Sequence, residues 1–260
     1  MPVESAQAAT DEIEAPTGAG TLVSIATYNE RENLPLLVDA VLTRLPEAHL
    51  LVVDDNSPDG TGDWCDAHAE NEPRLHCLHR TGKLGLGTAI VAAMQYAAEH
   101  DYRFLLNMDA DFSHDPRYLP DLLGGMDDAQ GEPRVDVMIG SRYVAGGGVE
   151  NWPLHRRLMS WAVNCYARLL LGLRPRDTSG AYRCYRVSLL RKMDWSQVRS
   201  WGYSFQEEIL WHLKRLGARM EESPIIFADR RYGSSKKNSR EARSALMTLF
   251  RLGLKNWFGV

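Results

Sequence analysis

Two aspartates one residue apart form the pattern with the clearest chemistry in this chain. Asp109-Ala110-Asp111 directly follows the apolar run 104–108, which is typical of a buried strand. In an extended segment, residues i and i+2 point to the same side, so the two carboxylates could bind one ion. Hard oxygen ligands suit Mg²⁺ or Mn²⁺, which also bind substrate phosphates. The alternative interpretation is a solvated turn before a helix, because Asp115-Pro116 follows.

A second acidic pair, Asp54-Asp55, ends the apolar run 50–53. A carboxylate at this position could accept hydrogen bonds from a nucleobase or a ribose, although turns are rich in aspartate for local reasons. The segment Gly82 to Gly87 is a glycine loop that opens a helix, but its spacing matches neither the dinucleotide nor the Walker motif. Its glycines could bring the backbone close to a ligand or could only pack the helix against the sheet.

Basic residues cluster at three places in the second half. Arg142 follows a predicted strand, Arg156 and Arg157 precede an apolar helix, and a further cluster surrounds residues 230–237. Any one of these charges is typical of a solvated surface. Together they indicate phosphate binding at more than one point, because arginine grips phosphate through two nitrogens and lysine supplies a point charge.

The elements that must position these residues alternate along the chain. Short apolar runs predict strands at 21–26, 50–53, 75–78 and 103–108, with helical patterns between them. Such alternation predicts an α/β fold with a mostly parallel, Rossmann-like sheet flanked by helices. Ligands of such sheets bind beyond the carboxyl ends of the strands. The polar clusters 27–30, 54–60 and 109–115 fall there.

The remaining sequence predicts one domain with two different ends. A strand near 135–140, helices at 158–171 and 205–216, and a strand at 225–227 continue the domain, which we place at 21–240. Residues 1–20 lack bulky apolar side chains and are predicted to be a disordered lead. Four scattered cysteines without a C-x-x-C pair indicate reduced thiols in a cytosolic protein.

The charge is unevenly distributed. The net charge is −4, yet residues 229–260 carry eight bases and two acids, a net of +6 against −10 elsewhere. Residues 241–260 predict an amphipathic C-terminal helix, with apolar Leu246, Leu249, Phe250 and Trp257 beside basic Arg251. That pattern is typical of a helix on an anionic membrane surface, and equally of a terminal helix docked on the body. No signal peptide and no uncharged run of ~18 apolar residues is visible.

Several of these motifs occur together in one order. They are ATYNEREN (26–33), VDDNSPDGT (53–61), KLGLGT (83–88), MDAD (108–111), SRY (141–143), NWPLHRR (151–157), DTSGAYR (177–183) and DRRYGSSK (229–236). The string resembles the dolichol- and polyprenol-phosphate mannose synthases, inverting family 2 glycosyltransferases of GT-A fold, and the resemblance covers about residues 21–240. Two positions depart from the family pattern: Ala26 stands where proline is common, and Ser113 where some relatives have glutamine.

The resemblance implies a donor site and a metal site. The positions that would hold the guanosine of GDP-mannose are Tyr28, Glu30, Val53 and Asp55. The positions that would hold the metal and the diphosphate are Asp109, Ala110 and Asp111, with Ser113 as a further metal ligand. The implied cofactor is Mg²⁺ or Mn²⁺.

The resemblance also implies phosphate contacts and catalytic positions. Arg142, Arg230 and Lys236 would contact donor or acceptor phosphate and, with Asp111, carry catalysis. Arg156 would be a further phosphate contact. Related transferases place a catalytic carboxylate near Gln206 and Glu208, with Glu207 as the alternative position.

The implied activity is metal-dependent, inverting transfer of mannose from GDP-mannose to a polyprenyl or dolichyl phosphate. The ionised acceptor would need no strong base, whereas a cation and basic side chains would stabilise the leaving diphosphate. The enzyme would work peripherally on the cytoplasmic face of a membrane, with or without an anchoring partner. The alternatives are another donor such as UDP-glucose, or a non-catalytic nucleotide- or lipid-binding module. Nucleic-acid binding lacks a recognition motif.

Overall fold

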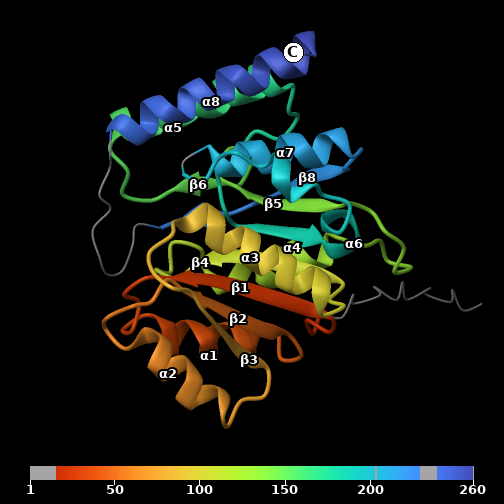
Figure 1. Cartoon of the computed structure of the whole chain (residues 1–260). Coiled ribbons are helices and arrows are strands. Elements are labelled where there is room, and N and C mark those ends of the chain that lie inside the picture. Colours follow the sequence, from red (N-terminus) through yellow and green to blue (C-terminus); the bar gives the residue numbers. More distant parts are fainter. Residues whose placement is uncertain (1–15, 203, 229–238, 260) are drawn as a thin grey trace, which may run out of the picture.

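A seven-stranded sheet forms the centre of the protein (Figure 1). The structure is a computed structural model and describes residues 16–202, 204–228 and 239–259. In spatial order the strands are β3 (Leu75–His79), β2 (His49–Asp54), β1 (Thr21–Thr27), β4 (Phe104–Asp109), β7 (Arg183–Arg186), β5 (Val137–Ser141) and β8 (Met220–Pro224). Two short strands, β6 (Gly148–Val149) and β9 (Ile226–Phe227), pair separately.

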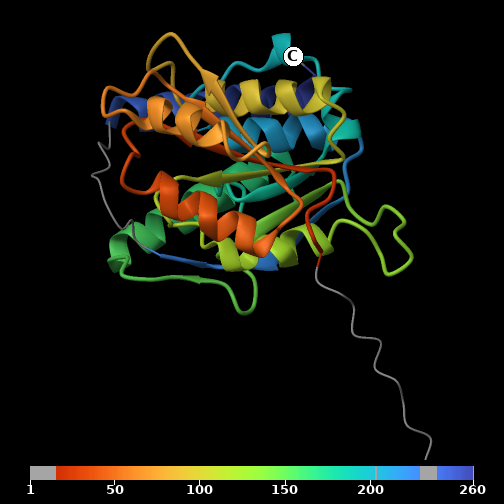
Figure 2. The same cartoon turned by 90° about the horizontal axis from the view of Figure 1, so that it is seen from below.

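Helices cover both faces of this sheet (Figure 2). They are α1 (Leu34–Arg44), α2 (Thr61–Ala69), α3 (Leu86–Glu99), α4 (Leu119–Gly124), α5 (Leu154–Leu171), α6 (Val187–Leu190), α7 (Phe205–Arg215) and α8 (Ser239–Phe258). Alternate residues of β1 enter opposite cores, because successive strand side chains point to opposite faces. Leu22 packs with α3 and α7, whereas Val23 packs with α1 and α4.

The sheet is mostly parallel, as predicted, with one exception that the sequence analysis missed. β7 lies antiparallel between β4 and β5. The short, fully buried run Arg183–Arg186 begins and ends in charged residues, which hid it from an apolar-pattern search. Because its direction is reversed, the loop before β7 reaches the sheet edge at which β4 and β5 end.

Several element boundaries also differ from the prediction. Of the helical pattern between the first two strands, only Leu34–Arg44 forms α1, and Asn29 lies outside it with a φ of 62° that no α-helix accommodates. α5 begins at Leu154, one turn before the predicted start. β6 and β8 were not predicted.

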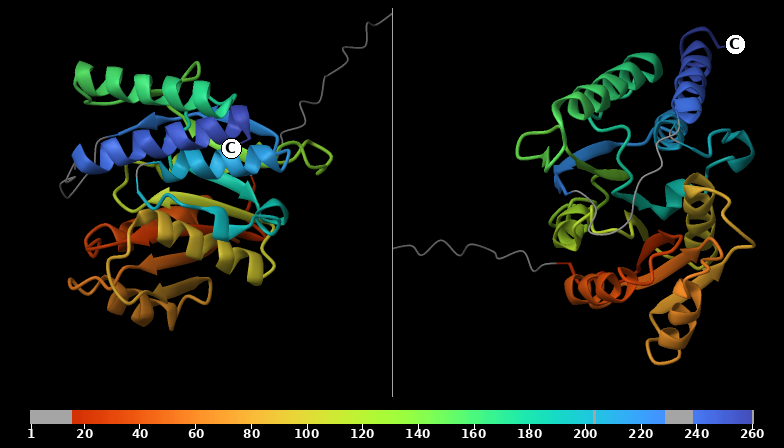
Figure 3. Two further views of the ribbon diagram at one scale, coloured as in Figure 1. Left: turned by 45° about the horizontal axis from the view of Figure 1, so that its top comes forward. Right: turned by 90° about the vertical axis from the view of Figure 1, so that its left-hand side faces the viewer.

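α8 lies against the outer side of the body, beside α5 and α7 (Figure 3). Leu249 and Leu252 of α8 are buried in the core that contains α7. The sequence left a docked helix and a membrane-lying helix open; one side of α8 is docked. Among the described residues, no helix combines the length and the apolar character needed to cross a bilayer.

The register of the central strands brings three polar segments to one edge. Ala26 of β1 is opposite Asp109 of β4, and Thr27 is opposite Asp54 of β2. The carboxyl ends of three parallel strands therefore coincide. The predicted site residues follow these ends directly.

Candidate active site at the carboxyl edge of the sheet

Asp109 and Asp111 stand at the end of β4, where the buried strand meets solvent. Asp111 is only 5% exposed, and its Oδ1 accepts both the hydroxyl of Ser113 at 2.5 Å and the backbone N–H of Ser113 at 3.1 Å. Asp109 is partly exposed. Ser113 therefore fixes the orientation of the inner carboxylate, while the outer one faces the site. Ala110 between them is buried.

His114 is buried beside this turn and bonds to its backbone. The backbone N–H of Asp109 donates to Nδ1 of His114 at 3.0 Å, and the imidazole stacks on Tyr182 with ring centroids 4.8 Å apart. Burial lowers the pKa of His114 and outweighs the nearby carboxylates, which would raise it. The ring is therefore neutral and carries its proton on Nε2.

Arg142 follows β5 and forms a buried, bidentate ion pair with Asp177. Its Nε and Nη2 each donate to one oxygen of Asp177 at 2.7 Å, and its backbone N–H donates to Oδ2 at 3.0 Å. Burial alone would lower the pKa of Arg142, but the charge and hydrogen bonds of Asp177 raise it. The predicted phosphate contact is thus a permanently charged, fixed guanidinium. The sequence did not identify Asp177 as the partner of Arg142, although Asp177 is the first residue of the DTSGAYR motif (177–183).

Two aromatic rings join Arg142 to Arg156. The guanidinium of Arg156 lies 3.8 Å from the ring centroid of Trp152, and that of Arg142 lies 5.7 Å from the same ring. Phe227 of β9 contacts the edges of both Trp152 and His114, with centroids 5.5 Å apart in each case. Contacts therefore run without a break from the aspartate turn to both arginines. The aromatic members of this set were not predicted.

The other predicted basic residues cannot be placed in this arrangement. Arg230 and Lys236 lie outside the described residues. Arg157 donates to the carbonyls of Trp152 and Val149, so it fixes the start of α5.

The predicted nucleotide positions lie at the ends of β1 and β2. Lys83 Nζ lies 3.9 Å from the ring centroid of Tyr28, which joins the glycine loop to the end of β1. Glu30 accepts a hydrogen bond from Asn33 Nδ2 at 2.8 Å. The side chain of Val53 belongs to the core, so any ligand contact of this residue comes from its main chain.

Asp55 is occupied by protein groups. Its Oδ1 pairs with Arg80 Nη1 at 2.8 Å, and its Oδ2 accepts the backbone N–H groups of Leu84 and Gly85. Both charged side chains are nearly buried. Asp55 therefore holds the glycine loop against the sheet edge, and Arg80 is a further site residue that sequence reasoning missed.

The last glycine of the loop, Gly87, is closely packed against other parts of the protein. A Cβ atom on Gly87 would lie 2.9 Å from the carbonyl oxygen of Trp201 and 3.0 Å from the Phe205 ring. Gly85 has a φ of +100°, which side chains rarely adopt. By contrast, a Cβ on Gly82 would meet nothing within 4 Å. Of the two interpretations left open, packing therefore explains Gly87, whereas Gly85 is explained by its backbone conformation.

The carboxylates at the start of α7 have different environments. Glu208 accepts the backbone N–H groups of Arg199 and Ser200, so it orders the preceding loop. Glu207 is fully buried, and burial raises its pKa to about 7, with Arg183, Asp177 and Arg142 close enough to influence it. The sequence favoured positions 206 and 208 for a carboxylate near the site; the geometry favours Glu207.

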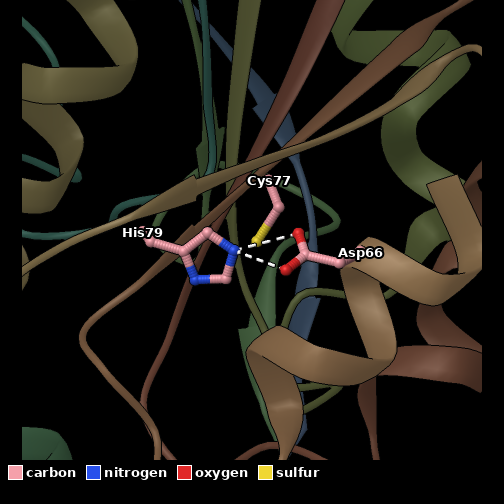
Figure 4. A group of neighbouring side chains, drawn as sticks. All are labelled: Asp66, Cys77 and His79. Atoms are coloured by element: carbon pink, nitrogen blue, oxygen red, sulfur yellow. Dashed lines mark hydrogen bonds and ion pairs between the residues drawn. The ribbon is translucent and has the colours of Figure 1, made fainter.

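A histidine–aspartate pair occupies the edge of the sheet at β3 (Figure 4). His79 Nε2 lies 2.9 Å from both oxygens of Asp66, and Cys77 lies beside them. The hydrogen bond that His79 donates to the Asp66 carboxylate raises the pKa of His79. Asp66 and His79 are about half exposed, and the pair ties α2 to β3. We assign it no part in the chemistry of the site.

This chain is similar to a known protein family and to characterised transferases. Residues 22–194 match the profile of the family described as glycosyl transferase family 2. The chain is 44% identical to "Undecaprenyl-phosphate mannosyltransferase" of Micrococcus luteus over 240 residues, covering 92% of this chain and 96% of the relative. It is also 44% identical to "Polyprenol monophosphomannose synthase" of Mycolicibacterium smegmatis, covering 90% and 87%.

Solved structures show the same fold. Glucosyl-3-phosphoglycerate synthase from Mycobacterium tuberculosis, in complex with Mn²⁺, UDP and phosphoglyceric acid, superposes with a TM-score of 0.61 at 17% identity. The match covers 93% of this chain and 80% of that structure.

Proposed function

The chain belongs to glycosyl transferase family 2, and we propose that it transfers mannose from GDP-mannose to the phosphate of a polyprenyl lipid, giving polyprenyl-phosphate mannose. The names of two relatives, each 44% identical over nine-tenths of the chain, support this sugar and this acceptor class. The structural observation that carries the proposal is the meeting of an acidic pair and two arginines at one sheet edge. His114 accepts the backbone N–H of Asp109, and Phe227 contacts both His114 and Trp152, the ring beside which both arginines lie.

The donor would lie along the ends of β1, β2 and β4. Tyr28, Glu30 and the main chain of Val53 would contact the guanosine. Asp55, engaged with Arg80 and the glycine loop, would shape this subsite from behind. The adjacency of Thr27 and Asp54 supports one continuous subsite that runs toward Asp109.

Asp109 and Asp111 would hold Mg²⁺ or Mn²⁺, with the hydroxyl oxygen of Ser113 as a further ligand. The donor set fits such an ion, because it consists of hard oxygens and one carboxylate is already oriented by Ser113. A fold relative is described in complex with Mn²⁺. When bound, the ion would neutralise charge that develops on the leaving diphosphate. Ala110, small and buried, would let the donor approach the main chain.

The basic residues would bring two anionic substrates together. Arg142 and Arg156 would contact phosphate, and the resemblance assigns the same task to Arg230 and Lys236. An oxygen of the acceptor phosphate would form a bond to the anomeric carbon while the bond to the GDP oxygen breaks, which inverts that carbon. A phosphate monoester has a second pKa of about 6 and is already ionised at neutral pH, so no side chain needs to remove a proton.

A radiolabelled GDP-mannose assay with membranes tests this proposal. We expect label in the organic phase that mild acid releases, together with loss of transfer on chelation of divalent cations. UDP-glucose assayed in parallel distinguishes the donor. Absence of lipid-linked label from GDP-mannose, with an active control enzyme, would overturn the proposed function.

A further inference from the structure

A sulfur, a ring nitrogen and a carboxylate meet where α2 packs on β3, the first strand of the sheet. Cys77 and His79 belong to β3 and Asp66 belongs to α2. One ligand atom of each of the three side chains lies within 4.8 Å of the other two, and Figure 4 shows the side chains pointing toward one another. Cys77 and His79 are two residues apart on a strand, so both point to the same face. Two elements therefore bring three different ligand types to one point.

The ring of His79 is held in one orientation. A Cβ on Gly62, in the first turn of α2, would lie 2.9 Å from His79 Cε1 and 3.1 Å from Nδ1, so the helix backbone closes on that side of the ring. Asp54, opposite His79 in the sheet register, has a carboxylate oxygen 3.2 Å from the same point. Nε2 therefore faces Asp66, at 2.9 Å. Histidines that bind a metal usually have a carboxylate, a carbonyl or a water near their other ring nitrogen, which fixes the ring.

The three ligand types are those of a zinc site. Zinc binds thiolate sulfur, imidazole nitrogen and carboxylate oxygen, whereas Mg²⁺ takes oxygen ligands. With bonds of about 2.0–2.3 Å, a tetrahedral zinc separates its ligand atoms by roughly 3.3–3.8 Å. Small side-chain rotations reach that spacing from the observed one. The side chains of Asp66 and His79 are 58% and 49% exposed, so an ion has access from solvent and a water has room to be the fourth ligand.

Protons hold this cluster together as the structure shows it. His79 Nε2 donates to the Asp66 carboxylate. A hydrogen bond with Cys65, together with burial, raises the pKa of the Cys77 thiol, so the sulfur carries its proton. Zinc would displace the thiol proton to solvent and bind the sulfur and Nε2 directly, as it does at cysteine–histidine sites. One thiolate and one carboxylate would then balance the two charges of the ion.

We propose that Cys77, His79 and Asp66 bind one zinc ion, with a water as the fourth ligand, and that this ion fastens α2 to β3. The site shares no ligand with Asp109 and Asp111, because β2 and β1 lie between β3 and β4. The two sites also differ in chemistry, since sulfur and nitrogen favour zinc and oxygen ligands favour Mg²⁺ or Mn²⁺. The inference goes beyond the proposed function and does not depend on it.

Cobalt absorption tests the sulfur ligand directly. Co²⁺ accepts the same ligands as zinc, and a bound thiolate gives a charge-transfer absorption that oxygen ligands do not give. The untagged full chain, kept reduced, is titrated with Co²⁺ in excess Mg²⁺. We expect the thiolate-to-cobalt absorption to appear and zinc to abolish it. Absence of this absorption in the unmodified chain would overturn the proposal.

Two pairs of variants locate the ion. Cys77→Ser should lose the absorption, whereas Cys165→Ser, which changes a thiol of similar burial on α5, should keep it. Asp66→Asn should weaken zinc binding about tenfold or more in competition with a chromophoric chelator, because even groups behind the ligands contribute about 10–100-fold. Asp63→Asn, at an exposed position one turn earlier on α2, should leave the affinity unchanged. Equal zinc affinities within both pairs would refute the assignment.

Thiol alkylation of the unmodified chain needs no variant. Zinc should slow the reaction of Cys77 with iodoacetamide and leave that of Cys165 unchanged, as read from the masses of the peptides that contain them. This measurement carries the test should Cys77→Ser fail to fold. Equal alkylation of Cys77 with and without zinc would contradict the proposal.

Melting temperatures separate this ion from one at the end of β4. Zinc binds the folded arrangement of α2 and β3, so at free zinc about 100-fold above the dissociation constant the melting temperature should rise by about 5–10 °C. Asp111→Ala should keep this rise and Cys77→Ser should lose it. The opposite result would place the ion beside Asp111 and overturn the proposal. Failure of mannose transfer would refute the proposed function and leave the zinc measurements unaffected.

Discussion

Replacing Asp177 by asparagine removes the partner of a buried arginine. The carboxylate of Asp177 is fully buried and accepts hydrogen bonds from the Nε, Nη2 and backbone N–H of Arg142 and from the backbone N–H of Gly180. Asparagine keeps the shape but offers one oxygen and no charge. Arg142, with a side chain 8% exposed, would then remain charged and buried without its ion-pair partner.

The expected loss of unfolding free energy follows from that burial. Removing one partner of a buried ion pair costs about 3–5 kcal/mol, because the remaining charge keeps its desolvation penalty. An exposed ion pair of similar geometry contributes less than about 1 kcal/mol. Arg191 and Asp101 form such a pair at 2.8 Å, with the Asp101 side chain 94% exposed. Asp101 has a φ of 56°, which asparagine tolerates, so Asp101→Asn is a matched control.

Urea unfolding followed by tryptophan fluorescence measures both variants. We expect Asp177→Asn to lose about 3–5 kcal/mol of unfolding free energy, or roughly 10 °C in melting temperature, and Asp101→Asn less than about 1 kcal/mol. The double variant Arg142→Met, Asp177→Asn should be more stable than Asp177→Asn, because it removes the buried guanidinium that Asp177→Asn leaves without its partner. Equal losses for Asp177→Asn and Asp101→Asn, with unchanged urea dependence, would refute this reasoning.

Three further predictions address the site and its support. Asp111→Ala should lower transfer about 100-fold or more at saturating metal; full activity would contradict the metal assignment. For Glu207, burial raises the folded pKa to about 7, so wild-type stability should fall as pH rises from about 4.5 to 7, by on the order of 3 kcal/mol. In urea titrations at pH 5 and pH 8, Glu207→Gln should not show that loss. A difference in unfolding free energy between the wild type and Glu207→Gln that is the same at both pH values would contradict the prediction. Gly87→Ala should cost about 1–3 kcal/mol because its Cβ meets Trp201 O at 2.9 Å, whereas Gly82→Ala, in open space, should cost less than about 0.5 kcal/mol.

The predictions that succeeded rest on local patterns. A buried apolar run followed by Asp109-Ala110-Asp111 requires only that a strand ends there, and β4 does end at Asp109. The alternation of strands and helices was enough to predict a parallel sheet, because each helix carries the chain back to the end of the sheet at which the previous strand began. The motif order resembled a family to which the chain belongs.

The roles that the sequence did not assign belong to residues whose environment depends on distant partners. Nothing in the sequence around His114 indicates Tyr182 or Phe227, which bury it. Glu207 and Glu208 are adjacent on α7, yet one is ordered by the loop 199–200 and the other lies among buried charges near Arg142. Helical rotation between neighbours, about 100° per residue, separates their environments, and the sequence alone does not set its phase.

The sequence by itself determined the fold class, the sheet edge at which we propose the active site and the acidic pair at that edge, because strand alternation and strand ends are properties of short segments. Only the tertiary structure decided what faces that pair. The reversed direction of β7 returns the loop 177–182 to the edge where β4 and β5 end, and this brings Asp177 to Arg142. Likewise, only the packing of α8 on α5 decided which of its apolar side chains are buried and which remain exposed. Both outcomes depend on contacts between segments far apart in the chain, whose pairing no local pattern encodes.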